Sequence, residues 1–397
     1  MAYTPDPTDV TNPLDTVDAS TAAAEFRALK GYVSTLVGGV GFASVNIFRK
    51  NVIIGGDFDT NPWQRGLNFV GAGNIYTADR WLGQKGGTFV VDVTRTLDVP
   101  ILGVAYKNRT MDLFARNCFQ VNVTTAEAVL GAGDFSYYTQ HIEGYDFRSI
   151  AQIPLVISFW HKHTKTGIYC VSFGNNGVNR SYIAEYTQAV ADTWEYESIP
   201  IPATPAAGSW SYDFHIGLSV TFVLGCGATL QTSAGVWTVG NFVASANQVN
   251  NLDTIGNKFR LALIQLEAGG IGSKFENRSM QEEMALCQRY YEKTFAQDVA
   301  PAQNAGLFVG QLSLRSAVAV ANANSLRWSF TTRKRFAPTI VTYNPSVANA
   351  NWRDTTAGAD RTVVVDTVDE GGATITISGV PVAGNLNQIH ATAEAEL

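Results

Sequence analysis

The stretch Ile216-Gly-Leu-Ser-Val-Thr-Phe-Val-Leu224 decides the fold class. Large apolar residues occupy every second position, and three of the four positions between them hold Gly, Ser and Thr. A β-strand places successive side chains on opposite faces, so this spacing predicts a strand with one face against a core.

Further stretches of the same kind lie on both sides of this strand, separated by loops rich in Gly, Asn, Thr and Pro. With no helices between them, the strands predict a mainly β protein built on an antiparallel β-sandwich, with loops long enough for a jelly roll. The charged fraction of 16% is well below the roughly 25% of ordinary soluble domains. The predicted strands span residues 89–93, 119–123, 154–163, 169–173, 194–201 and 259–266.

The chain divides into four predicted segments. Residues 1–45 form an extended, Pro-rich arm and a short helix, and residues 46–278 form the jelly roll. Ser279-Met-Gln-Glu282 matches a capping box, so it opens a connecting helix over residues 279–298. A smaller C-terminal β domain covers residues 299–397.

The helix of the first segment carries its apolar residues at spacings of four and three, which puts them on one stripe. This is the pattern of a coiled coil, and two heptads need support from the rest of an oligomer. A single amphipathic helix that folds back onto its own domain explains the stripe equally well. The residues concerned are Ala22, Phe26, Leu29, Val33 and Leu36.

Charge and hydropathy exclude two classes of partner. The net charge is −6 and the Lys and Arg residues are scattered, so we expect no nucleic-acid binding. No apolar stretch reaches the roughly 20 residues of a membrane helix, and the N-terminus lacks the pattern of a secretory signal, so we expect no membrane insertion. The four cysteines show no metal-site spacing and are expected to be free, buried thiols.

No motif of a known catalytic site or cofactor site is present, so we expect neither an enzyme nor a cofactor. His161 and His163 share a strand face but have no further ligand at suitable spacing, which favours packed histidines. Asp57 and Asp59 are weak candidates for a structural Ca²⁺ site. The alternative is an Asx turn, in which the carboxylate binds nearby backbone N–H groups.

Aromatic residues in predicted loops are the candidates for carbohydrate binding, because the C–H face of a sugar stacks on an aromatic ring. Each of them could be a core residue instead. Trp81, Trp160 and Trp194 fall in strand-like contexts and are assigned to the core. The loop candidates are Trp210, Tyr212, Trp237, Tyr137 and Tyr138.

Three parts of the sequence resemble bacteriophage tail-fibre and head-fibre proteins. The N-terminal Tyr3-Thr-Pro-Asp-Pro-Thr-Asp9 and the following Ala19–Lys30 resemble the segment that docks such fibres onto a virion. The middle is similar to a carbohydrate-binding-module-like jelly roll of phage fibres, and Ile389–Leu397 resembles the closing strand of a fibre tip. The middle is matched at Asn51–Asp59, Trp63–Gly66, Tyr76–Trp81, Ile142–Arg148, Ile264–Glu267 and Cys287–Tyr291.

This resemblance implies a homotrimeric, non-catalytic fibre or spike subunit of the virion, assembled in the cytoplasm of the host bacterium. Its N-terminus would contact other virion structural proteins, and the protein would bind host surface polysaccharide. A second hypothesis is a purely structural head-fibre, collar or decoration protein, and a third is a polysaccharide depolymerase. The resemblance supplies no motif for the sugar site.

Overall fold

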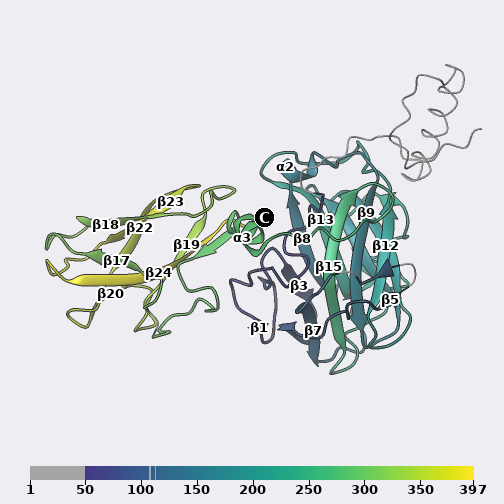
Figure 1. Cartoon of the computed structure of the whole chain (residues 1–397), viewed down its shortest axis with the longest axis horizontal. Coiled ribbons are helices and arrows are strands. Elements are labelled where there is room, and N and C mark those ends of the chain that lie inside the picture. The colour runs from purple at the N-terminus through teal and green to yellow at the C-terminus, as the bar shows by residue number, and fades with distance from the viewer. Residues whose placement is uncertain (1–49, 107–108, 112, 307) are drawn as a thin grey trace, which may run out of the picture. The chain divides into compact units, whose positions relative to one another are not determined.

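The computed structural model describes residues 50–106, 109–111, 113–306 and 308–397. The predicted arm and helix of residues 1–45 lie outside the described residues. The described part is mainly β, with antiparallel strand pairing throughout its sheets, as the sequence predicts (Figure 1). Among these residues, no helix combines the length and the apolar character that crossing a bilayer requires.

Two large sheets form the sandwich. The first sheet contains, in spatial order, β1 (Asn68–Phe69), β4 (Val90–Thr96), β7 (Cys118–Thr125), β15 (Lys258–Ala268), β9 (Leu155–His163) and β12 (Glu195–Ile201). The second contains β14 (Trp237–Thr238), β11 (Ser181–Gln188), β10 (Gly167–Asn175), β13 (Ile216–Cys226), β8 (Phe135–Glu143), β3 (Leu82–Gly86) and β2 (Ile75–Tyr76). A short hairpin of β5 (Ala105–Tyr106) and β6 (Arg109–Thr110) lies apart from both sheets.

Eight strands of the sandwich, β7 to β13 and β15, are its principal strands. They pair in a nested order, in which each pair along the chain lies inside the one before it. The first of them, β7, pairs with the last, β15, and β8 pairs with β13. Inside these, β9 pairs with β12, and β10 with β11. Such pairing arises when one long hairpin folds over so that its strands are divided between two sheets. This arrangement is the jelly roll. The predicted fold class is therefore confirmed by the strand pairing itself.

The core lies between the two sheets and is rich in aromatic rings. Phe222 of β13 meets Phe159 of β9, in the opposite sheet, edge to face, with ring centroids 5.0 Å apart. Trp81 and Trp160 are 0% and 3% exposed, which confirms their assignment to the core, and Trp194 is half-buried. His163 is fully buried and stacks on Phe259 at 4.1 Å, as expected for a packed histidine.

The segment from Asn51 to Leu67 is not a strand, although it lies at the start of the predicted jelly roll. It fills an irregularity in β15, whose pairing with β9 shifts between Ala262 and Gln265. The side-chain amide of Asn51 donates to the carbonyl of Ile264 at 3.1 Å, and its oxygen accepts from the amide of Leu266 at 3.0 Å. A side chain therefore supplies hydrogen bonds that a neighbouring strand would otherwise make.

The connecting helix is shorter than predicted. α3 (Met280–Gln288) begins where the capping box places it, since the Ser279 hydroxyl accepts from the amide of Glu282. Residues 289–298 are not helical, because Tyr291 and its neighbours form β16 (Tyr291–Lys293) and pair with β24 (Leu386–Glu394). Hydrogen bonding to a distant strand here overrides continuation of the helix.

The C-terminal part is β-rich, and β24 is its central strand. A small apolar core of its own includes Trp328, Trp352 and Ile389. A hairpin that turns around Gly371 joins β22 (Val363–Asp369) to β23 (Gly372–Ile377). The strands around β24 are β16, β17 (Leu312–Arg315), β19 (Thr339–Tyr343), β20 (Trp352–Asp354) and β21 (Ala359–Arg361), and a three-stranded sheet holds β18 (Asn324–Ser329), β23 (Gly372–Ile377) and β22 (Val363–Asp369).

Candidate functional site

Three of the five predicted aromatic residues come together on one surface. The indole rings of Trp210 and Trp237 meet edge to face, with centroids 5.8 Å apart. Phe147 of α2 (Gly144–Phe147) stacks on Trp210 at 5.3 Å and on Tyr212 at 5.9 Å. Tyr182 of β11 contacts Trp237 at 5.5 Å. We call these five residues the aromatic cluster.

The loop between β12 and β13 holds the aromatic cluster in place. Its carbonyl groups accept hydrogen bonds from both indoles: Trp210 donates to Ala207 and Trp237 donates to Pro202, each at 3.2 Å. The same loop packs directly on Gly144, where an added Cβ would lie 2.7 Å from backbone atoms of Asp213. A glycine is therefore required for α2 to approach the loop this closely.

Polar side chains border the aromatic cluster on the turn between β10 and β11. The Asn179 amide donates to the hydroxyl of Ser209 at 3.1 Å and accepts from the backbone amide of Ser209 at 3.2 Å. A Cβ added at Gly208 would lie 2.7 Å from Arg180 Cγ and 3.2 Å from Trp210 Nε1, so both side chains approach the same glycine. The Arg180 side chain therefore lies beside the indole of Trp210, and an amide and a hydroxyl lie at the loop that carries this residue.

Exposure differs within the aromatic cluster. Tyr212 is 42% exposed even though it stacks on Phe147, so part of its ring faces solvent. Trp210 and Trp237 are half-buried and pack against the core of the sandwich. Phe147 is fully buried. Tyr212 is therefore the ring most open to a ligand, and Phe147 stacks behind it.

Tyr137 and Tyr138 do not join this surface. They lie on β8 rather than in a loop, so they point to opposite faces of the sheet. Tyr138 is 2% exposed and packs edge to face on Phe119 at 4.9 Å, which makes it a core residue. Burial raises its pKa. Tyr137 stacks on Phe135 at 5.1 Å in an apolar layer on the outer face of the second sheet.

Asp57 and Asp59 are engaged by hydrogen bonds. The Asp57 carboxylate accepts from the backbone amides of Asp59 and Thr60 and from the Thr60 hydroxyl, the last at 2.7 Å. This is the Asx-turn alternative, and burial raises the pKa of Asp57. Asp59 accepts from the side-chain amide of Asn117 at 2.6 Å. No group of three or more His, Cys, Asp or Glu residues that could hold a metal occurs among the described residues.

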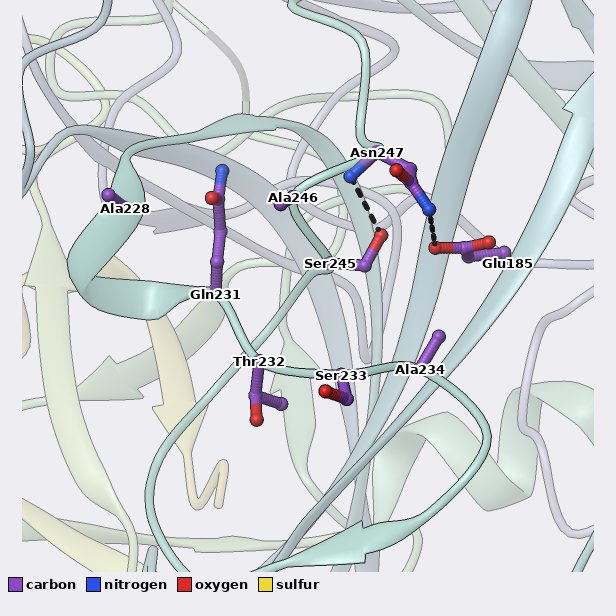
Figure 2. A pocket seen from close by; sticks show the side chains of 9 residues that line it. All are labelled: Glu185, Ala228, Gln231, Thr232, Ser233, Ala234, Ser245, Ala246 and Asn247. Carbon is purple, nitrogen blue, oxygen red and sulfur yellow. Dashed lines mark hydrogen bonds between the residues drawn. The ribbon is translucent and has the colours of Figure 1, made fainter.

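A second surface feature is an open pocket of about 730 Å³, which we call the polar groove. Figure 2 shows Gln231 on one side of it, and Glu185 with Asn247 on the other. It opens over the outer face of the second sheet, where Glu185 projects from β11. The lining residues are Glu185, Ala228, Gln231, Thr232, Ser233, Ala234, Ser245, Ala246 and Asn247.

No sequence pattern indicates the polar groove. Its residues come from three separate segments, and none of them belongs to a motif. Backbone hydrogen bonds join the segments, including Thr232 N to the carbonyl of Ala244 at 2.9 Å and Gly235 N to that of Ile183 at 2.9 Å. Only the tertiary path of residues 227–250 brings the polar side chains together.

No protein-family model matches the chain, and no curated protein sequence matches it. One similar solved structure is the carbohydrate-binding module TmCBM61 in complex with β-1,4-galactotriose. The match covers 55% of this chain and 99% of the TmCBM61 chain, at 9% sequence identity and a TM-score of 0.28. Another is a family 11 carbohydrate-binding module from Clostridium thermocellum. That match covers 52% of this chain and 99% of the module's chain, at 14% sequence identity and a TM-score of 0.26.

Proposed function

We propose that the chain is a non-catalytic fibre or spike subunit of a bacteriophage particle that binds glycan on the host surface through the aromatic cluster. The observation that carries the glycan-binding part is the half-exposed ring of Tyr212 in the aromatic cluster, whose Trp210 lies beside the Arg180 side chain. The phage part rests on the sequence resemblance of the N-terminal segment and of the middle of the chain.

Binding would follow from the geometry of the aromatic cluster. A sugar ring stacks its C–H face on Tyr212, while amide and guanidinium groups bind its hydroxyls. The ring of Tyr212 is already held by Phe147 at 5.9 Å, so little side-chain freedom is lost on binding. A single site of this kind is weak. Three copies in a homotrimer would multiply its effect on a polysaccharide with repeated units.

The carboxylate nearest in sequence to Tyr212 is unsuited to acid catalysis. Asp213 accepts hydrogen bonds from the Ser211 hydroxyl at 2.6 Å and from the backbone amide of His215 at 2.9 Å. These bonds lower the pKa of Asp213, whereas the general acid of a glycosidase needs a raised pKa. This supports binding over depolymerisation.

The proposal is tested with the full chain in two assays, a glycan array and competition for phage adsorption to host cells. We expect the protein to bind a polysaccharide and to block adsorption, and we expect Tyr212→Ala to lose both effects. The matched control is Phe336→Ala, which removes an aromatic ring of similar exposure, 37%, from the C-terminal part. Binding that is unchanged by Tyr212→Ala contradicts the proposed site. Absence of binding to every host glycan favours the purely structural role, and shortened polysaccharide after incubation favours the depolymerase.

A further inference from the structure

The polar groove carries a single charge. Glu185 is the one ionisable side chain among the nine described residues that line it, and the other polar members are amides and hydroxyls. The remaining walls are three alanines, with no aromatic ring among the lining residues. The groove therefore cannot hold a neutral sugar by stacking, and its ligand must be recognised by hydrogen bonds and charge.

Internal hydrogen bonds fix the polar groups of the groove. The Asn247 amide donates to one oxygen of Glu185 at 3.0 Å, and the backbone amide of Asn247 donates to the Ser245 hydroxyl at 3.2 Å (Figure 2). The Gln231 amide donates to the carbonyl of Cys226 at 2.9 Å, which leaves its oxygen as an acceptor. Held in this way, the groups lose little freedom when a ligand binds.

The floor beneath the groove is rigid and apolar. Cys170, Ile183 and Val223 are fully buried there, and Leu230 and Ala234 pack on them from the loop above. Backbone bonds from Val243 and Thr232 tie the two sides of the loop together. The volume of about 730 Å³ falls within the range of small-molecule sites, about 300–1,000 Å³. The groove is thus a stable, preformed feature of the surface.

We infer that the polar groove is a second binding site, for a hydroxyl-rich ligand that carries an ammonium group, such as an amino sugar with a free amine. The free oxygen of Glu185 accepts the ammonium in a charge-assisted hydrogen bond. Gln231, Thr232 and Ser233 bind neighbouring hydroxyls. A Ca²⁺ ion fits less well, because it prefers six to eight oxygens and one carboxylate supplies at most two.

This site is separate from the aromatic cluster and does not rest on the proposed function. Glu185 and Tyr182 lie three residues apart on β11, about 10 Å along the strand, and point to opposite faces of the sheet. A substitution at Glu185 therefore leaves the aromatic cluster intact. Each site can fail its test without affecting the result at the other.

The test is calorimetric titration of the full chain with a glucosamine tetramer, an N-acetylglucosamine tetramer and a glucose tetramer. We expect only the glucosamine tetramer to bind at the groove, and we expect added salt to weaken this binding. Glu185→Gln keeps the shape of the side chain and removes its charge, and should weaken binding about tenfold or more. Glu282→Gln, at an exposed carboxylate of α3, is the matched control and should change nothing.

Equal binding of the acetylated and the free amine would overturn the role of charge. Unchanged glucosamine binding by Glu185→Gln would overturn the site. Glucosamine binding that is lost in Tyr212→Ala but kept in Glu185→Gln would assign it to the aromatic cluster instead, and would also overturn the inference. Glucosamine binding that Tyr212→Ala retains and Glu185→Gln loses supports the inference.

Discussion

Glu396 forms a buried ion pair with Arg80, a residue from the early part of the jelly roll. Both side chains are at most 4% exposed, and Arg65 also pairs with Glu396, at 3.1 Å. Arg80 in turn lies over the ring of Tyr290, with its guanidinium carbon 3.5 Å from the ring centroid. The end of the chain is thereby tied to the sandwich through charges that water does not reach.

Replacing Glu396 by Ala should lower the free energy of unfolding by about 3–5 kcal/mol, because the substitution leaves Arg80 charged, buried and without its carboxylate. Urea denaturation followed by tryptophan fluorescence measures the loss. Glu370→Gln is the control, since Glu370 pairs with Arg333 at 3.5 Å in an exposed position and should cost less than about 1 kcal/mol. Equal losses in the two variants would show that the buried pair does not stabilise the fold.

Trp210→Ala should destabilise the fold more than Tyr212→Ala does. Trp210 packs against the sandwich core, so its removal should cost roughly 2–3 kcal/mol, less than for a fully buried Trp. Tyr212 is 42% exposed, and its removal should cost about 1 kcal/mol. Thermal and urea denaturation give both values. A larger loss for Tyr212 than for Trp210 would be incompatible with the packing described above.

Stability should fall as the pH drops below about 6.5. Burial lowers the pKa of His163 well below its usual value, and it lowers the pKa of His141 to about 4. Both histidines therefore stay neutral in the folded state while the unfolded chain takes up protons. Their contribution is complete above pH 6.5 and is lost as the pH falls toward the folded-state pKa values.

The histidine effect is isolated by comparing the wild type with His163→Phe between pH 4 and 7.5. The difference in unfolding free energy should change by up to about 1.4 kcal/mol per pH unit below pH 6.5. The comparison is needed because Asp79, whose pKa burial raises to about 6, acts in the opposite sense. Its contribution is present below about pH 4 and is lost as the pH rises through 6. Parallel profiles for the two proteins would contradict the prediction.

Gly144→Ala should displace the loop that carries the aromatic cluster. The new Cβ would lie 2.7 Å from backbone atoms of Asp213 and Ser211, which cannot move as a side chain could. We expect a loss of about 1–3 kcal/mol in stability and weaker binding of whichever glycan the wild type selects. Gly133→Ala, where nothing lies within 4 Å of the added Cβ, should leave both unchanged. Wild-type binding and stability in Gly144→Ala would argue against the close approach.

The sequence predicted strands where polar and apolar residues alternate, as in β13, and where apolar runs are bounded by turns, as in β9. It missed β8, because Tyr137 and Tyr138 follow a Gly-rich turn and read as loop residues until the pairing with β13 is known. The helix at 279–298 was predicted too long, since β24 lies about 100 residues later and its pairing with Tyr291 is not visible locally.

The candidate site was predictable only in part. Trp210, Tyr212 and Trp237 could be selected because rings in Gly- and Pro-rich stretches suit sugar binding, but their joint packing on Phe147 depends on α2, which no periodicity indicates. Glu185 and Asn247 could not be selected. Single polar residues on a strand and in a loop are ordinary, and the meeting of these two depends on the path of residues 227–250.

The nested strand order also sets the sequence of events during synthesis. When residues up to 257 have left the ribosome, seven of the eight principal strands exist, but β7 and β9 still lack the neighbour that stands between them. Contacts such as that of Phe119 with Leu261 must wait for β15, so the nascent chain carries two unsatisfied strand edges until its last third emerges. Such edges invite pairing with other chains. A chaperone that covers strand edges should therefore raise the yield of folded protein.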